Sequence, residues 1–239
     1  MRKILVASGD SWTAGTKIED KQYKFWPNIL AKKLGWKVLN VGRGGAGNEF
    51  IYNSIVDTLS KTENVGLAIC LWSHFDRWDF PEQSFKVNPK NPKPFGGYTS
   101  VCLAEKRQKV LDAVFENNLA SDEYNIYRSL RWFNAFQNYC KCNDVPYIQT
   151  EAFYPTYLGQ TNLIHNFIDH PLFDSILEKH FLGWPIYREI GGKTMWDKLN
   201  EVDPTMTKLR VSALDTHPND KGHEYIAEFL YDKYKEIYL

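Results

Sequence analysis

The residue types that could act together in this sequence are a serine near its beginning and an aspartate and a histidine near its end. Ser11 lies in the segment Ala-Ser-Gly-Asp-Ser-Trp at residues 7–12, and Asp215 stands two residues before His217. Residues two apart in an extended segment point to the same side. The Asp215 carboxylate can therefore hold one ring nitrogen of His217 while the other nitrogen takes a proton from Ser11. Together the three residues predict a nucleophilic triad for acyl transfer.

A turn at the end of a regular element is expected to position each part of this triad. The apolar run at residues 3–7, closed by Gly9, is typical of a buried strand, and Ser11 follows its carboxyl end. Ligands bind at that edge of open α/β sheets. We expect Asp10 to hold the turn through hydrogen bonds to backbone N–H groups. The alternative is that Asp10 and Ser11 only cap the helix that follows.

The rest of the chain alternates strand and helix patterns. Strands are expected at residues 36–41, 65–72 and 146–150, with a last short strand or loop at 209–214. Helices are expected at residues 25–34, about 48–61 and 122–143, and after the Pro-Asn turn that follows His217. This order predicts an α/β fold, a three-layer flavodoxin-like sandwich with a central parallel sheet of about five strands. We expect residues 1–239 to form one domain.

Two insertions interrupt this pattern, at about residues 80–120 and 152–205. The first contains several prolines and a Gly-Gly pair, which favour an irregular loop over the carboxyl edge of the sheet, and a helix could begin after Ala104. The second is rich in aromatic residues and contains His165, His170 and His180. We expect both insertions to shape a pocket over the site.

Composition argues against several classes of function. Lys plus Arg and Asp plus Glu are equal, at 29 each, so no net charge would attract nucleic acid. No apolar stretch reaches the roughly 20 residues of a membrane span. The first apolar run is also too short for a secretory signal, so we expect a soluble, cytoplasmic protein. Cys70 and Cys102, with the pair Cys140 and Cys142, are too few for a disulfide scaffold and lack zinc-ligand spacing, which favours reduced thiols.

The glycine-rich segment at residues 40–48 has two interpretations. Gly42, Gly44 and Gly47 match the spacing of a dinucleotide-binding loop. That loop usually follows the first strand of its fold, whereas this segment follows the second, and Ser11 already occupies the first turn. In the second interpretation, the glycines let the backbone approach a substrate, and the helix that begins at Asn48 adds positive potential.

The Gly-Asp-Ser turn, the glycine-rich segment and the Asp-Thr-His-Pro block at residues 215–218 resemble the GDSL/SGNH hydrolases. The blocks fall in that family's order along the whole chain. The resemblance implies a serine esterase without metal or organic cofactor, with Ser11 as nucleophile, His217 as base and Asp215 orienting the imidazole. It also implies an oxyanion hole formed by the N–H groups of Ser11 and Gly45. The family's substrates are mostly small-molecule acyl esters, including acetyl groups on carbohydrates.

The third block departs from the family's pattern. Most members carry Gly-x-Asn-Asp after the third strand, and the asparagine donates to the oxyanion, whereas this chain has Trp-Ser-His at residues 72–74. The Ser73 hydroxyl or the His74 ring could donate instead. The family also more often places its aspartate three residues before the histidine. The competing interpretation is therefore a catalytically weak or inactive binding or structural module with this fold.

Several further residues are candidates for substrate binding: Trp12, Asn48, His74 and Arg77. Arg77 could clamp an anionic group, although an ion pair with the neighbouring Asp76 or Asp79 is the alternative. The Trp12 ring could stack on a sugar, as could those of Trp78 and Trp184, although core packing is the better expectation for any one aromatic residue. We expect His223, on the C-terminal helix, to be a surface residue.

Overall fold

The protein is described here from a computed structural model that covers residues 2–14, 24–81, 98–101, 113, 116–117, 121–155 and 163–239. Five parallel strands form its central sheet: β1 (Ile4–Gly9), β2 (Lys37–Asn40), β3 (Val65–Trp72), β6 (Tyr147–Glu151) and β7 (Phe181–Leu182). Their order in the sheet is β2-β1-β3-β6-β7, which is the flavodoxin-like order. The predicted α/β fold is confirmed.

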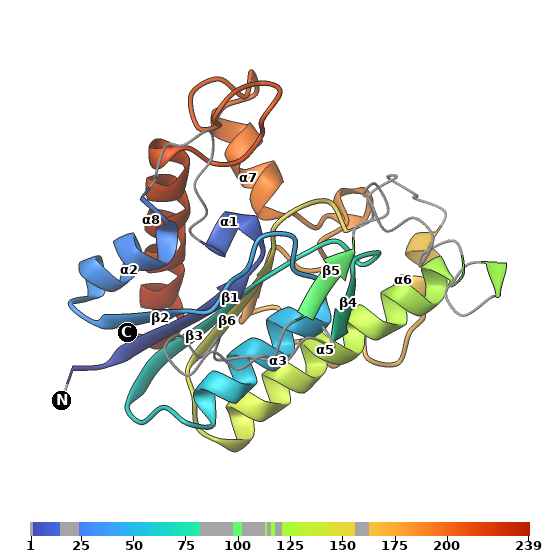
Figure 1. The fold of residues 1–239 in the computed structure, drawn as a ribbon, viewed down its shortest axis with the longest axis horizontal. Helices are drawn as coiled ribbons and strands as arrows, with labels where there is room; N and C mark the ends of the chain where they lie inside the picture. Colours follow the sequence, from blue (N-terminus) through green and yellow to red (C-terminus); the bar gives the residue numbers. More distant parts are fainter. Residues whose placement is uncertain are drawn as a thin grey trace.

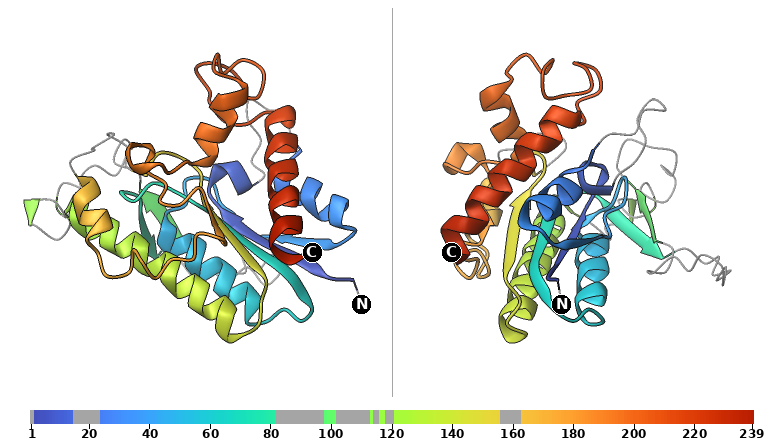
Figure 2. Two further views of the ribbon diagram at one scale, coloured as in Figure 1. Left: turned by 180° about the vertical axis from the view of Figure 1, so that it is seen from behind. Right: turned by 90° about the vertical axis from the view of Figure 1, so that its left-hand side faces the viewer.

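Helices cover both faces of this sheet (Figures 1 and 2). On one face, α2 (Trp26–Leu34) and α8 (Asp220–Tyr238) contact each other, with α7 (Met195–Val202) beside α8. On the other face, α3 (Asn48–Leu59) packs against α5 (Asp122–Cys142), and α5 also contacts α6 (Ile164–Ile168). Within the described ranges, no helix is both long and apolar enough to cross a membrane.

Alternation along the strands explains why both faces are covered. In β1, Leu5 and Ala7 pack with residues of α2 and α8, whereas Val6 packs with residues of α3 and α5. Side chains of a strand alternate between the two faces of its sheet, so a strand that is apolar throughout must be buried on both sides. The layers thus follow directly from the apolar runs in the sequence.

The register brings the carboxyl ends of the inner strands to one level. Gly9 pairs with Leu71, and Trp72 pairs with Glu151. The segments that follow β1, β3 and β6 therefore begin side by side at one edge of the sheet. The short helix α1 (Ser11–Ala14) starts at this edge.

The insertions contain more regular structure than the sequence predicts. In the first, β4 (Trp78–Pro81) and β5 (Tyr98–Val101) form an antiparallel ribbon. The helix expected after Ala104 lies outside the described residues, apart from short fragments. In the second insertion lie α6, α7, the 3-10 turn η2 (Arg188–Ile190) and the fifth strand, β7. Residues 209–214, expected as a last strand or loop, are a loop with a single bridge between Arg210 and Pro218.

Candidate active site

The turn that carries Ser11 is built by its neighbours. The Asp10 carboxylate accepts a hydrogen bond from the Trp12 N–H at 2.9 Å, and the Asp10 carbonyl accepts from the N–H groups of Thr13 and Ala14. Asp10 therefore caps α1 and holds the turn, as predicted. Ser11 begins the helix and is partly exposed.

Gly9 allows the chain to turn this tightly at the edge of the sheet. A Cβ atom at this position would stand 2.3 Å from the Thr13 hydroxyl oxygen and 2.9 Å from the Leu71 carbonyl oxygen. Both distances are too short for a side chain. The glycine of the Gly-Asp-Ser turn is therefore required by packing between β1, α1 and β3.

The aspartate and histidine lie on a loop that is closed on itself. The Val211 N–H donates to the His217 carbonyl, and the Ser212 N–H donates to the Asp215 carbonyl. Asn219 anchors the end of the loop, since its side chain caps α8 and donates to the carbonyl of Arg210. This loop brings His217 to the edge of the sheet where Ser11 lies.

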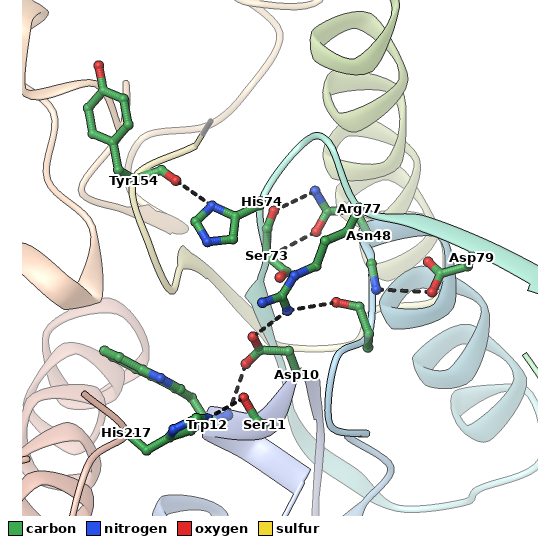
Figure 3. Close-up of polar contacts among 12 residues, drawn as sticks. Asp10, Ser11, Trp12, Asn48, Ser73, His74, Arg77, Asp79, Tyr154 and His217 are labelled. Atoms are coloured by element: carbon green, nitrogen blue, oxygen red, sulfur yellow. Dashed lines mark hydrogen bonds and ion pairs between the residues drawn. The ribbon is translucent and has the colours of Figure 1, made fainter. Parts of the chain in front are cut away.

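The three candidate triad residues form a continuous hydrogen-bonded chain, of which Figure 3 shows the contact between Ser11 and His217. His217 Nε2 lies 2.9 Å from Ser11 Oγ, and His217 Nδ1 lies 2.5 Å from Asp215 Oδ1. The aspartate also accepts the His217 backbone N–H at 3.1 Å, so a gap of two residues suffices for the contact. The histidine and aspartate side chains are 36% and 28% exposed, so the group is open to solvent. An imidazole that donates from Nδ1 to a carboxylate presents Nε2 as the acceptor for a hydroxyl proton.

Two backbone N–H groups at this edge are available to a ligand. The N–H groups of Ser11 and Gly45 donate to no protein acceptor in the part of the chain that the structure describes. Gly45 has a φ of +74°, a conformation that favours glycine. Its loop is fixed against the serine turn, because the Arg43 N–H donates to the Gly9 carbonyl at 2.9 Å.

Ser73 and Asn48 bond to each other instead of facing a substrate. The Asn48 side chain accepts the Ser73 N–H at 2.8 Å and donates to the Ser73 carbonyl at 2.9 Å and to the Ser129 hydroxyl. The Ser73 hydroxyl oxygen is buried and has no hydrogen-bond partner among the residues that the structure describes. In this conformation neither side chain is presented for substrate binding or oxyanion stabilisation.

His74 and Trp12 are likewise held by the protein. The His74 ring stacks on Phe153, and its Nδ1 lies 2.8 Å from the Tyr154 carbonyl oxygen. Burial and the nearby Arg77 guanidinium lower the pKa of His74 to about 3, so its ring is neutral at ordinary pH. Trp12 is 1% exposed and stacks on a second tryptophan, which matches the expectation of core packing.

Arg77 forms an ion pair, but with a partner that its sequence neighbours did not suggest. Its Nη1 lies 2.8 Å from the fully buried carboxylate of Asp10 and 3.3 Å from the Ala46 carbonyl oxygen (Figure 3). This contact differs from the predicted ion pair with Asp76 or Asp79. At the edge of the sheet, Arg77 lies beside the serine turn and pairs with Asp10 there.

Asp79 occupies the position that a phosphate would take in a dinucleotide-binding loop. Its carboxylate accepts the N–H groups of Gly47 at 3.0 Å and Phe50 at 2.9 Å, at the beginning of α3. A helix N-terminus that already binds a carboxylate offers little to an anionic ligand. The geometry therefore opposes the dinucleotide interpretation, and it also removes the positive potential expected from the helix that begins at Asn48.

Sequence reasoning missed one buried carboxyl group at this edge. Glu151 ends β6 and is fully buried, and within the described part of the chain neither of its carboxyl oxygens makes a hydrogen bond of ordinary geometry. Burial and the charge of Asp10 raise its pKa well above the usual range, despite the opposing charge of Arg77. The only sequence signal was a glutamate directly after an apolar strand.

His223 also differs from expectation. It is 1% exposed, not a surface residue, because its ring packs against Phe25, which precedes α2. Burial lowers its pKa to about 3. Among the other candidates, Trp78 donates to the Asn125 side chain and Trp184 packs in an aromatic cluster, so both rings serve packing.

Comparison with known proteins gives structural but no sequence matches. No protein-family model matches the chain, and no curated protein is similar to it in sequence. Among solved structures, it is similar to a protein assigned to the lipolytic G-D-S-L family from Desulfitobacterium hafniense DCB-2, with 15% identity, a TM-score of 0.51, and coverage of 97% of this chain and 99% of that chain. It is also similar to the psychrotrophic esterase EstA from a Pseudoalteromonas species, with 10% identity, a TM-score of 0.52, and coverage of 98% and 97%. The protein therefore has the fold of the GDSL/SGNH hydrolases.

Proposed function

We propose that this protein is a serine ester hydrolase of the GDSL/SGNH type. The observation that carries the proposal is the hydrogen-bonded chain from Asp215 through His217 to Ser11, at the carboxyl edge of the sheet. A base within about 3 Å of its hydroxyl needs no rearrangement to accept the proton. The structural likeness to an esterase adds support, because open α/β folds bind ligands at the carboxyl edge of the sheet, which Ser11 follows.

The proposed reaction transfers an acyl group from an ester to water. Ser11 Oγ attacks the ester carbonyl carbon while His217 Nε2 takes the hydroxyl proton, and Asp215 stabilises the imidazolium that forms. The N–H groups of Ser11 and Gly45 donate to the oxyanion of the tetrahedral intermediate. His217 then gives its proton to the leaving alcohol. Water next attacks the acyl-enzyme with the same base, releasing the acid and the free serine.

The proposed substrates are small-molecule or carbohydrate esters, acetyl esters among them, and the mechanism uses no metal or organic cofactor. The carbonyl must approach Ser11 from the solvent side, where His217 is partly exposed. Trp12, the residue after Ser11, is buried and packs against Phe153 and Trp196, which anchors the turn in the core. Ester binding therefore depends on the partly exposed side of the turn, and nucleic acid is not a proposed partner.

The competing function is a binding or structural module that keeps the fold. It was suggested by the missing asparagine of the third block, and a distance above about 5 Å between Ser11 and His217 would have favoured it, since a base must come within about 3 Å. The observed 2.9 Å favours the enzyme.

The test combines turnover with covalent labelling. Hydrolysis of p-nitrophenyl acetate and of longer p-nitrophenyl esters is measured for the wild type, Ser11→Ala and the matched control Ser60→Ala, whose serine lies exposed at the end of α3. A fluorophosphonate probe is applied to each, since the similar Pseudoalteromonas esterase was solved inhibited by monoethylphosphonate. We expect Ser11→Ala to lose both signals and Ser60→Ala to keep them. A well-folded wild type that takes up no probe contradicts the proposal and favours the binding module.

A further inference from the structure

Arg77 connects the two segments that carry the proposed oxyanion donors. One nitrogen of its guanidinium, Nη1, contacts Asp10, which precedes Ser11 (Figure 3). The same nitrogen contacts the carbonyl of Ala46, which follows Gly45. Ser11 and Gly45 carry the two N–H donors, and the neighbour of each in the chain is bound to the same nitrogen of Arg77. Together with the Arg43 N–H bond to the Gly9 carbonyl, this cation holds the serine turn and the glycine loop at a fixed separation.

The segment that contains Arg77 also holds the residues that follow Ala46. Asp79 accepts the Gly47 N–H at 3.0 Å, and the backbone of Ser73 is bound on both sides by the Asn48 side chain. Three consecutive residues after Gly45 are thus each tied to residues 73–79. In this chain, residues 73–79 bind the glycine loop through these contacts and do not present an amide side chain to the substrate.

The charge of Arg77 has a second consequence for the serine turn. The Asp10 carboxylate is fully buried one residue before Ser11, and the Arg77 side chain is only 13% exposed. Without a cation, a buried negative charge this close would oppose the charge that develops on the oxyanion. The ion pair removes that repulsion. Burial and the charge of Asp10 raise the pKa of Glu151, the second carboxyl here, which disfavours a further negative charge beside the turn.

We propose that Arg77 is a positioning residue for the proposed oxyanion hole in this chain, which lacks the third-block asparagine. It places the N–H groups of Ser11 and Gly45 relative to each other and neutralises Asp10, without touching the substrate. The role in turnover rests on the proposed hydrolase function, whereas the placement of the two segments does not.

Turnover gives the first test. Arg77→Met is compared with Arg77→Lys and with the control Arg188→Met, which also removes an arginine from an ion pair, at a more exposed position. We expect Arg77→Met to lower kcat for p-nitrophenyl acetate about 100-fold, close to the loss of one oxyanion donor, with KM changed less than about threefold. Arg77→Lys recovers part of kcat, because it keeps the charge but not the planar group. An Arg77→Met enzyme with kcat equal to that of Arg188→Met overturns the proposal.

The double variant Asp10→Asn with Arg77→Met keeps the test valid if the single variant does not fold. It leaves no unpaired buried charge, and we expect its kcat to stay low, because the contact with Ala46 is still lost. A double variant with wild-type kcat overturns the proposal.

Amide hydrogen exchange separates this proposal from the proposed function. In Arg77→Met we expect faster exchange at the hydrogen-bonded amides of Ala46 and Gly47 and of residues 12–14, with unchanged exchange in α8. This readout does not depend on any substrate. Unchanged exchange in the glycine loop overturns the positioning role even in an active enzyme, whereas a wild type that fails to hydrolyse esters contradicts only the hydrolase.

Discussion

The raised pKa of the buried Glu151 carboxyl group can be tested by measuring the stability of the protein as a function of pH. Its side chain is fully buried, and burial together with the charge of Asp10 raises its pKa well above the usual range. The folded protein therefore keeps this proton at pH values at which the unfolded chain has released it. We predict that Glu151→Gln, which preserves both shape and neutrality, abolishes this difference in proton binding.

The size of the effect follows from proton linkage. Between the ordinary glutamate pKa of about 4.3 and the raised pKa of folded Glu151, the folded wild type binds up to one more proton than the unfolded chain. Its free energy of unfolding then falls by up to about 1.4 kcal/mol for each unit of rising pH. The glutamine variant lacks this slope. The free energy of unfolding of Glu151→Gln, relative to that of the wild type, should therefore increase from about pH 5 upward and level off above the pKa of Glu151 in the folded protein.

Urea unfolding of both proteins at about pH 5, 6 and 7 measures this difference, with unchanged m values as the condition for comparison. Glu236→Gln, on an exposed carboxylate of α8, controls for the loss of one acidic group. Parallel stability curves for the wild type and Glu151→Gln would refute the reasoning. A glutamine variant that loses stability relative to the wild type as pH rises would show instead that Glu151 is ionised and paired with Arg77.

Three further predictions concern the turn, the triad and the loop before it. Asp215→Asn should lower kcat for p-nitrophenyl acetate by about 100-fold to 10,000-fold, less than Ser11→Ala, and an unchanged kcat would contradict its orienting role. Gly9→Ala should cost about 1–3 kcal/mol in urea unfolding, because its Cβ meets the Leu71 carbonyl, and wild-type stability would contradict this packing. Burial opposes ionisation of Asp203, yet hydrogen bonds from three backbone N–H groups lower its pKa to about 2. The stability advantage of the wild type over Asp203→Asn should therefore be complete above about pH 4 and disappear as pH falls through about 2, as followed by circular dichroism, and a constant advantage would contradict it.

Features that depend on local periodicity could be predicted from the sequence. The apolar runs that became β1 and β3 predicted buried parallel strands, because such strands are covered on both faces. The two-residue spacing of Asp215 and His217 predicted their contact, because residues two apart in an extended segment point to the same side. Ser11 was then placed by the rule that parallel strands gather their carboxyl ends at one edge.

Features that depend on which distant segments meet could not be predicted. Arg77 pairs with Asp10, 67 positions away, because the sheet places the segments after β1 and β3 side by side, and no local spacing reports that. His223 is buried because α2 packs on α8. The fifth strand, β7, has two residues, too few to give a periodic signal, and pairs with β6 only through the tertiary fold.

The 206 positions that separate Ser11 from His217 have a consequence for folding. Ser11, the proposed nucleophile, begins α1 directly after the first strand, and His217, the proposed base, lies in the loop before α8. Their contact is highly non-local in the sequence, so we expect it to close late. Secondary structure and most of the sheet can form while the serine still lacks its base. Recovery of ester hydrolysis should therefore lag behind recovery of circular dichroism during refolding, which makes enzymatic activity a reporter of when α8 docks.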